Sequence, residues 1–229
     1  MTPMNDEIFE AVITSLDAAG RPHVAPFGVR YRGEQVVLMP FKPSTTLANL
    51  RASGHAVLNL TTDTRVFASA VCARWLGARP LADGDLSLLA ARAVPGVRLA
   101  SALAHSELRL AHDDDHPERP TLVFDRVHDA SHAPFRGFNR AQAAVVEGAV
   151  LVSRLHLLPA DKIDAEMAYL QIAIDKTAGP GEHQAWGWLR EAVARQRTGP
   201  PAAGTEPTAP GVPSAGDTQV MANARPAVP

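Results

Sequence analysis

Cysteine is nearly absent from this sequence of 229 residues, since Cys72 is the only one. An internal disulfide and a cysteine-rich zinc site are therefore excluded, and a single thiol fits a reducing compartment. Aromatic residues make up only 5%, and neither sign of charge dominates, because the formal net charge is -2. The sequence also lacks a basic run, so we expect no nucleic-acid-binding face.

Long apolar runs are missing as well. No stretch reaches the length needed to cross a membrane. The first ten residues are polar and acidic, unlike a signal peptide, which is basic and then apolar. We therefore expect a soluble, cytoplasmic protein that does not contact a membrane. With 46% hydrophobic residues the chain can still form a substantial core, and its length suits one large domain or one domain with a smaller addition.

Alternating and β-branched segments predict strands, and the first three, joined by short turns, predict an antiparallel meander. The expected strands are Ile8–Leu16, Pro22–Tyr31, Gln35–Met39, His55–Thr61, Glu107–Ala111 and Thr121–Val127. Pro26-Phe27-Gly28 interrupts the second of them. Proline removes a ladder donor and glycine permits close approach to the backbone, so the segment predicts either an edge strand with a bulge or a surface for a flat ligand.

The segment Phe41–Leu50 joins the third strand to a predicted helix and is a candidate anion site. Ser44 or Thr45 is a suitable N-cap. The first turn of a helix has backbone N–H groups without intrahelical partners and the positive end of the helix dipole. In this segment the hydroxyls of Ser44, Thr45 and Thr46 and the ammonium of Lys42 add to these backbone N–H groups. Together they suit a phosphate monoester. The alternative is an ordinary capped helix whose hydroxyls face water.

The rest of the chain is less regular and then becomes helical. Glycine and proline punctuate residues 73–103, which we expect to be loop-rich with a short helix at Leu86–Val94. The acidic and histidine-rich segment His112–Pro117 is interpreted as a solvated hairpin tip rather than a metal site, and we expect no metal. The helices expected from apolar spacing begin at Thr62 or Asp63, at Asn139, near Ile163 and near Glu182.

The order of five short segments resembles the DUF447 family of flavin reductase-like split barrels. These segments are Ala25–Val29, Phe41–Leu50, Leu58–Asp63, Phe138–Glu147 and Asp175–Gly179. The resemblance runs from about Glu7 to Ala194 and implies an α+β fold, an antiparallel split β-barrel with a C-terminal helical addition. The domains expected are an FMN-binding barrel over 1–135, with the loop-rich excursion at 73–103, and a helical part over 136–197 packed on it. A disordered tail rich in Pro, Ala and Gly is expected over 198–229.

The resemblance also implies which residues of this sequence contact the cofactor FMN. Those expected to hold its phosphate are Lys42, Ser44, Thr45 and Thr46. Those expected along the isoalloxazine edge are Pro26, Phe27, Gly28 and Val29. Those expected near the ribityl chain or ring are Asn49, Asn59 and Thr61. Those expected to approach from the helical part or from a second subunit are Arg140, Lys176 and Thr177. The alternative for Asn49 is that it points to solvent, and for Arg140 that it is a surface charge. For Lys176-Thr177 the alternative is a favourable helix C-terminus.

These expectations predict an FMN-binding flavoprotein and, first of all, a flavin reductase-like oxidoreductase. No catalytic acid or base stands out. NAD(P)H is a candidate electron donor although the sequence lacks a G-x-G-x-x-G fingerprint, which split barrels do not need. The resemblance implies a homodimer with flavin near the interface and a link to tetrahydromethanopterin-dependent one-carbon metabolism. The alternatives are a non-catalytic protein that binds FMN or another phosphorylated ligand, and a structural protein whose helices form a partner surface.

Overall fold

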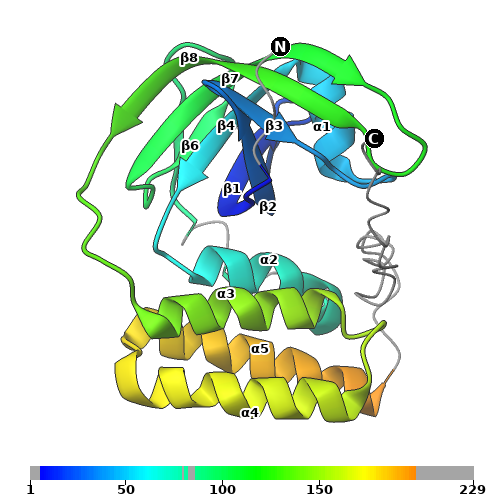
Figure 1. Cartoon of the computed structure of the whole chain (residues 1–229), viewed down its shortest axis with the longest axis vertical. Helices are drawn as coiled ribbons and strands as arrows, with labels where there is room; N and C mark the ends of the chain where they lie inside the picture. The colour runs from blue at the N-terminus through cyan, green and yellow to red at the C-terminus, as the bar shows by residue number, and fades with distance from the viewer. Residues whose placement is uncertain (1–5, 79, 82–85, 200–229) are drawn as a thin grey trace, which may run out of the picture.

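The computed structural model describes residues 6–78, 80–81 and 86–199, which form a β-barrel above a layer of helices (Figure 1). The barrel is closed and antiparallel, with the strand order β1-β2-β3-β8-β7-β4. Its strands are β1 (Phe9–Leu16), β2 (Pro22–Arg32), β3 (Gln35–Leu38), β4 (His55–Leu60), β7 (Ala104–Asp114) and β8 (Thr121–Ser131). A separate two-stranded hairpin is formed by β5 (Leu88–Ala90) and β6 (Val97–Leu99).

Of the helices in the described residues, one belongs to the barrel and four form the layer beside it. Helix α1 (Thr45–Ser53) lies between β3 and β4, and its Leu47 and Leu50 join the core inside the barrel. The helices of the layer are α2 (Arg65–Leu76), α3 (Arg140–Ser153), α4 (Ala160–Thr177) and α5 (Pro180–Thr198). None of the helices in the described part of the chain is long and apolar enough to span a bilayer.

Alternation along the strands produces two separate cores. Ile13 and Leu58 point into the barrel, whereas their neighbour Val12 points outward and packs against the helical layer. Cys72 of α2 lies in this second core, where burial raises the pKa of its thiol to about 12. The thiol is therefore a buried apolar group and not a nucleophile.

The structure confirms the antiparallel barrel and its helical addition but differs from the predictions in three places. The second strand is continuous, because its register with β1 is regular from Val29 to Pro22 and includes Pro26 opposite Val12, so the predicted bulge is wrong. The helix predicted at Leu86–Val94 is also wrong. Pro95-Gly96 turns the chain there, and Ala91 N–H donates to the Gly96 carbonyl at 2.9 Å to close the β5–β6 hairpin.

The third difference concerns the ends of elements. Helix α2 begins at Arg65, after Thr64, rather than at Thr62 or Asp63, because the Asp63 carboxylate accepts hydrogen bonds from the backbone and guanidinium of Arg65. The tail predicted to be disordered over 198–229 lies outside the described residues from residue 200 onward. Thr198 is the last residue of α5, and Gly199 is its C-cap.

Candidate functional site

The junction between β3 and α1 has the helix start that the sequence predicts. Ser44 is the N-cap in an extended conformation, and its Oγ accepts a hydrogen bond from the Leu47 amide at 3.2 Å. The Gly54 amide donates to the Leu50 carbonyl at the other end of the helix, where Gly54 has a φ of 67°. The helix is therefore short and fixed at both ends, with its positive end directed toward the Lys42–Ser44 segment.

Two predicted ligands on α1 point into the protein. Thr46 is only 5% exposed, and its Oγ1 lies 3.2 Å from Nε2 of His23 at the start of β2. Asn49 is also 5% exposed and donates from Nδ2 to Oγ of Ser15 at the end of β1. Both side chains therefore fasten α1 to the barrel. Ser44 and Thr45 are the half-buried hydroxyls at the helix start.

Lys42 is engaged by the hairpin that was expected to be a solvated tip. Its Nζ lies 2.5 Å from Oδ1 of Asp115, and Arg51 at the end of α1 pairs with the same oxygen at 2.6 Å and with Asp113 at 2.7 Å. Hydrogen bonds from Arg51 and Lys42 lower the pKa of Asp115 to about 2. The β7–β8 hairpin is thus held over α1 by ion pairs of two carboxylates, Asp113 at the end of β7 and Asp115 in the connection.

Two arginines that the sequence reasoning missed lie beside the same junction. Arg119 donates from Nε to the Met39 carbonyl at 3.0 Å, and its guanidinium lies 4.5 Å from the ring centroid of Phe41. Arg30 of β2 donates to the Met39 sulfur at 3.5 Å, and its buried Nε has no hydrogen-bond partner among the described residues. Burial and the charge of Arg30 lower the pKa of Arg119.

Neither arginine forms an ion pair with a carboxylate in the part of the chain that the structure describes. Two neighbouring cations that repel each other, next to the positive end of a helix, are stabilised by an anion. From the sequence, Arg30 could have been assigned to the outer surface of β2 only because it follows Val29, which alternation places inside the barrel. No local motif identifies Arg119. Lys42, Arg30 and Arg119 thus form the cationic part of the candidate site.

The four residues expected along the isoalloxazine edge divide between the two faces of β2. Val29 is fully buried inside the barrel, and Phe27 packs against the same core. A Cβ at Gly28 would lie 2.7 Å from Cγ2 of Ile8, so the close approach predicted at this glycine is made by Ile8 of the same chain. Pro26 is half-buried. Pro26 and Gly28 therefore lie on the outer face of β2, whereas Phe27 and Val29 face the core inside the barrel.

Asn59 and Thr61 use their polar groups within the protein. Asn59 is fully buried, donates to the Val12 carbonyl at 3.2 Å and accepts from the Leu99 amide at 2.8 Å, which joins β6 to the barrel. Thr61 donates to the Ser101 carbonyl at 3.0 Å. We leave Asn59 out of the proposed site for this reason.

The three predicted residues of the helical part lie away from the junction. Thr177 Oγ1 accepts from the Ala141 amide at 3.0 Å and donates to the Ala173 carbonyl at 2.8 Å. It therefore ties the end of α4 to the start of α3, where Arg140 and Lys176 are exposed. Figure 1 shows this corner at the lower left, with α1 at the upper right. Within one chain the structure does not bring these residues to the β3–α1 junction.

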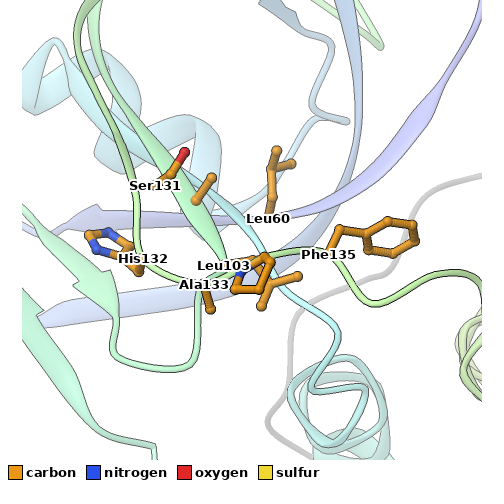
Figure 2. A pocket seen from close by; sticks show the side chains of 8 residues that line it. Leu60, Leu103, Ser131, His132, Ala133 and Phe135 are labelled. Carbon is orange, nitrogen blue, oxygen red and sulfur yellow. The ribbon is translucent and has the colours of Figure 1, made fainter.

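A hollow of about 620 Å³ lies where β4 and β8 end, away from α1 (Figure 2). Its walls are mostly apolar, and Leu60, Leu103 and Phe135 contribute to them. His132 is the imidazole at its edge. The sequence reasoning did not find this hollow, because its lining comes from three segments that lie far apart in the sequence, at Leu60, Leu103–Ala104 and Ser131–Phe135.

One solved structure supports the fold, and two others resemble parts of this chain. The FMN-bound protein MM1853 from Methanosarcina mazei, described with the family model DUF447, has a TM-score of 0.67 and 18% identity over 82% of this chain and 96% of its own. The 2-nitrobenzoate 2-nitroreductase NbaA from Pseudomonas fluorescens has a TM-score of 0.45 and 19% identity, over 54% of this chain and 64% of its own. A putative flavin reductase from Haemophilus somnus has a TM-score of 0.45 and 11% identity, over 57% and 83%.

Comparison with sequences gives the family. No match was found among the curated proteins. A family model described as the N-terminal domain of a protein of unknown function, DUF447, matches residues 9–133. A second model of the same description, DUF447, matches residues 139–191. Since these matches cover more than half of the chain, the protein belongs to the DUF447 family.

Proposed function

We propose that this protein is an FMN-binding flavoprotein of the flavin reductase-like kind, with the flavin phosphate held at the β3–α1 junction. The observation that carries this proposal is the pair Arg30 and Arg119, which contact Met39 and lack carboxylate partners among the described residues. The family and the barrel are shared with MM1853, which is FMN-bound, and this supports FMN as the anion that the arginines accommodate.

The groups at the junction fit a phosphate dianion. Arg30, Arg119 and Lys42 would supply positive charge, and Ser44 with the first amides of α1 would supply hydrogen-bond donors. Asp115 already pairs with Lys42, so a phosphate would have to share or replace that carboxylate. The outer surface of β2 at Pro26 remains the proposed support for the isoalloxazine ring, whereas Ile8 lies against Gly28.

FMN supplies hydride or electron transfer when it is bound, and the protein supplies binding, orientation and electrostatics. In this proposal the arginines hold the charged end of the cofactor, and the half-buried Phe41 beneath Arg119 excludes water from one side of that contact. NAD(P)H stays the proposed electron donor. The link to tetrahydromethanopterin-dependent one-carbon metabolism stays a prediction of the family resemblance.

A homodimer remains part of the proposal. Arg140 and Lys176 are exposed and lie far from α1 in their own chain, so they could reach the flavin only from a second subunit. Sedimentation at several protein concentrations, with and without FMN, measures this state. A monomer in both conditions would remove these residues from the site.

The first experiment is an absorbance spectrum of the purified protein before and after FMN is added and the excess is removed. Retained flavin bands are expected, and NAD(P)H oxidation is then assayed. Retained FMN without NAD(P)H oxidation would favour the non-catalytic binding protein. A flavin-free spectrum with no uptake would remove the flavoprotein proposal.

The phosphate contact is tested with Arg119→Gln. This variant should weaken FMN by roughly tenfold to a hundredfold, because one hydrogen bond to a charged group contributes about 1.5–3 kcal/mol. Riboflavin, which lacks the phosphate, should bind equally well to the variant and to the unchanged protein. Arg126→Gln is the matched control, since Arg126 pairs with Asp129 at 2.8 Å on β8. Equal losses for both ligands would remove Arg119 from the phosphate site.

A further inference from the structure

Three side chains from neighbouring strands converge on the outer surface of the barrel, beneath the loop between β5 and β6. His105 and Glu107 alternate along β7 and therefore point to the same side. His128 of β8 lies directly opposite Glu107 in the sheet. One imidazole nitrogen or carboxylate oxygen from each of the three lies within 4.8 Å of the others. The flavin proposal uses none of these residues.

The carboxylate of this cluster is fixed rigidly in place. Glu107 is fully buried, and it accepts hydrogen bonds from the backbone amides of Arg92, Ala93 and Val94 at 2.7, 2.5 and 3.0 Å. Only one of these amides donates to Oε1, so this oxygen keeps an acceptor position, which is directed toward His105. The second acceptor position of Oε1 therefore faces the imidazole of His105.

The distance between Oε1 of Glu107 and Nε2 of His105 matches the distance between two ligand atoms of one metal ion. Nε2 of His105 lies 3.3 Å from Oε1 of Glu107, which is longer than a usual N–H···O bond of about 2.9–3.0 Å. Two ligand atoms that each lie about 2.0–2.1 Å from a tetrahedral metal ion are about 3.4 Å apart. The observed distance is therefore the one expected for two ligands of the same ion.

The other ring nitrogen of His105, Nδ1, has a hydrogen-bond partner, as is usual for a histidine that binds a metal. Its Nδ1 lies 2.9 Å from Nε2 of His132, and the two ring planes are within 10° of parallel, with centroids 5.0 Å apart. A histidine that binds a metal through one nitrogen usually donates its other N–H to a nearby acceptor, which fixes the ring and its tautomer. His132 can accept that proton, and it lines the hollow of Figure 2.

We propose that His105, Glu107 and His128 bind a divalent first-row transition metal ion, with Zn²⁺ as the probe. Two imidazole nitrogens and one carboxylate oxygen suit such an ion. Three protein ligands leave a coordination position for water or a substrate group. Nε2 of His105 is the ligand atom, its Nδ1–H donates to His132, and the half-buried His128 side chain rotates to close the third bond.

The experiment titrates full-length protein, freed of metal with a chelator and of FMN, with Zn²⁺ by calorimetry and with Co²⁺ by visible absorbance. One ion per chain is expected. His128→Ala should weaken Zn²⁺ binding by more than a hundredfold, and His132→Ala, which removes only the supporting acceptor, by roughly tenfold to a hundredfold. His112→Ala is the matched control, because His112 is an exposed histidine of the same strand outside the cluster. Its affinity should not change.

Two results would overturn the metal site. One is the absence of Zn²⁺ binding by a protein whose circular dichroism shows the native fold. The other is equal Zn²⁺ affinity in His128→Ala and in the unchanged protein, which would assign the ion to an adventitious surface position. Among the residues that the structure describes, His128 forms no hydrogen bond whose loss would destabilise the fold, so the variant is expected to fold. Because FMN is absent from the titration, its outcome does not depend on the flavin proposal.

Discussion

Asp115 illustrates how one exposed carboxylate can position a whole connection. It receives hydrogen bonds from Arg51 at 2.6 Å and from Lys42 at 2.5 Å, and these lower its pKa to about 2. A carboxyl group whose pKa is lowered by folding stabilises the folded state while it is ionised. Its contribution is complete above the ordinary value of 3.8 and is lost as the pH falls through about 2.

Asp115→Asn is therefore expected to lower the melting temperature at neutral pH and to make no difference at the lowest pH. The gap between the variant and the unchanged protein should begin to close below about pH 4 and should be gone only well below pH 2, because at about pH 2 the carboxyl group of the folded state is still half ionised. Calorimetry across this pH range measures it. Asp114→Asn, in the same hairpin, is the control. Identical pH profiles for the two variants would contradict the role of Asp115.

Residues with a local signal could be predicted, and residues that depend on the packing of distant strands could not. Ser44 was recognised as a cap because the pattern before a helix is local. Thr46 was taken for a phosphate ligand, yet the strand that carries His23 buries it. Arg30 and Arg119 were missed because they meet only after β2 and the β7–β8 connection come together at Met39.

Helix α3 shows how a helix–helix contact is encoded by a glycine. Gly148 faces α5, and a Cβ there would lie 2.7 Å from Cζ3 of Trp186 and 3.1 Å from Cδ1 of Leu189. Gly187 of α5 is exposed, and a Cβ there would meet no atom within 4 Å. The two glycines therefore occupy helices for different reasons, since only Gly148 permits close packing.

The pair Gly148→Ala and Gly187→Ala should change stability in opposite directions. The first should lower the free energy of unfolding by about 1–3 kcal/mol, because the added methyl overfills the contact. The second should raise it by roughly 0.5–1 kcal/mol, because alanine restricts the unfolded chain and favours the helix. Urea unfolding measures both. A neutral or stabilising Gly148→Ala would mean that Trp186 can move aside at little cost.

At the level of elements, long periodic segments were predictable and short ones were not. The helix from Asn139 is expected from its apolar spacing, and Asn139 fixes its start by accepting hydrogen bonds from the Ala141 and Gln142 amides. The Gln142 side chain donates to Glu182 of α5 at 3.1 Å, a contact that no pattern local to this helix predicts. The β5–β6 hairpin was mistaken for a helix because three-residue strands carry too little periodicity to identify them.

The helical layer is built from both halves of the sequence. Helix α2 comes before β7 and β8, yet its Phe67 and Trp75 share a core with Trp186 and Leu189 of α5. Trp75 also donates from Nε1 to the Val152 carbonyl of α3 at 3.1 Å. A division of the chain at residues 135 and 136, which the resemblance suggested, would therefore cut through one continuous core.

A fragment of residues 1–135 is expected not to fold stably by itself. It would expose the apolar face of α2, so we expect aggregation or binding of a hydrophobic dye. Co-expression with residues 136–229 should restore a complex with the circular dichroism of the unbroken chain. The opposite result, a monomeric fragment with a cooperative thermal transition, would show that the barrel is an independent domain.

The distribution of tryptophan has a consequence for optical measurements. Trp75, Trp186 and Trp188 are the only tryptophans of the chain. The first two lie in the core of the helical layer, and Trp188 packs against that core. Intrinsic tryptophan emission therefore reports on the helices alone, whereas flavin bound at the proposed site would report on the barrel. A single denaturation followed at both wavelengths would show whether the two layers lose their structure together or in succession.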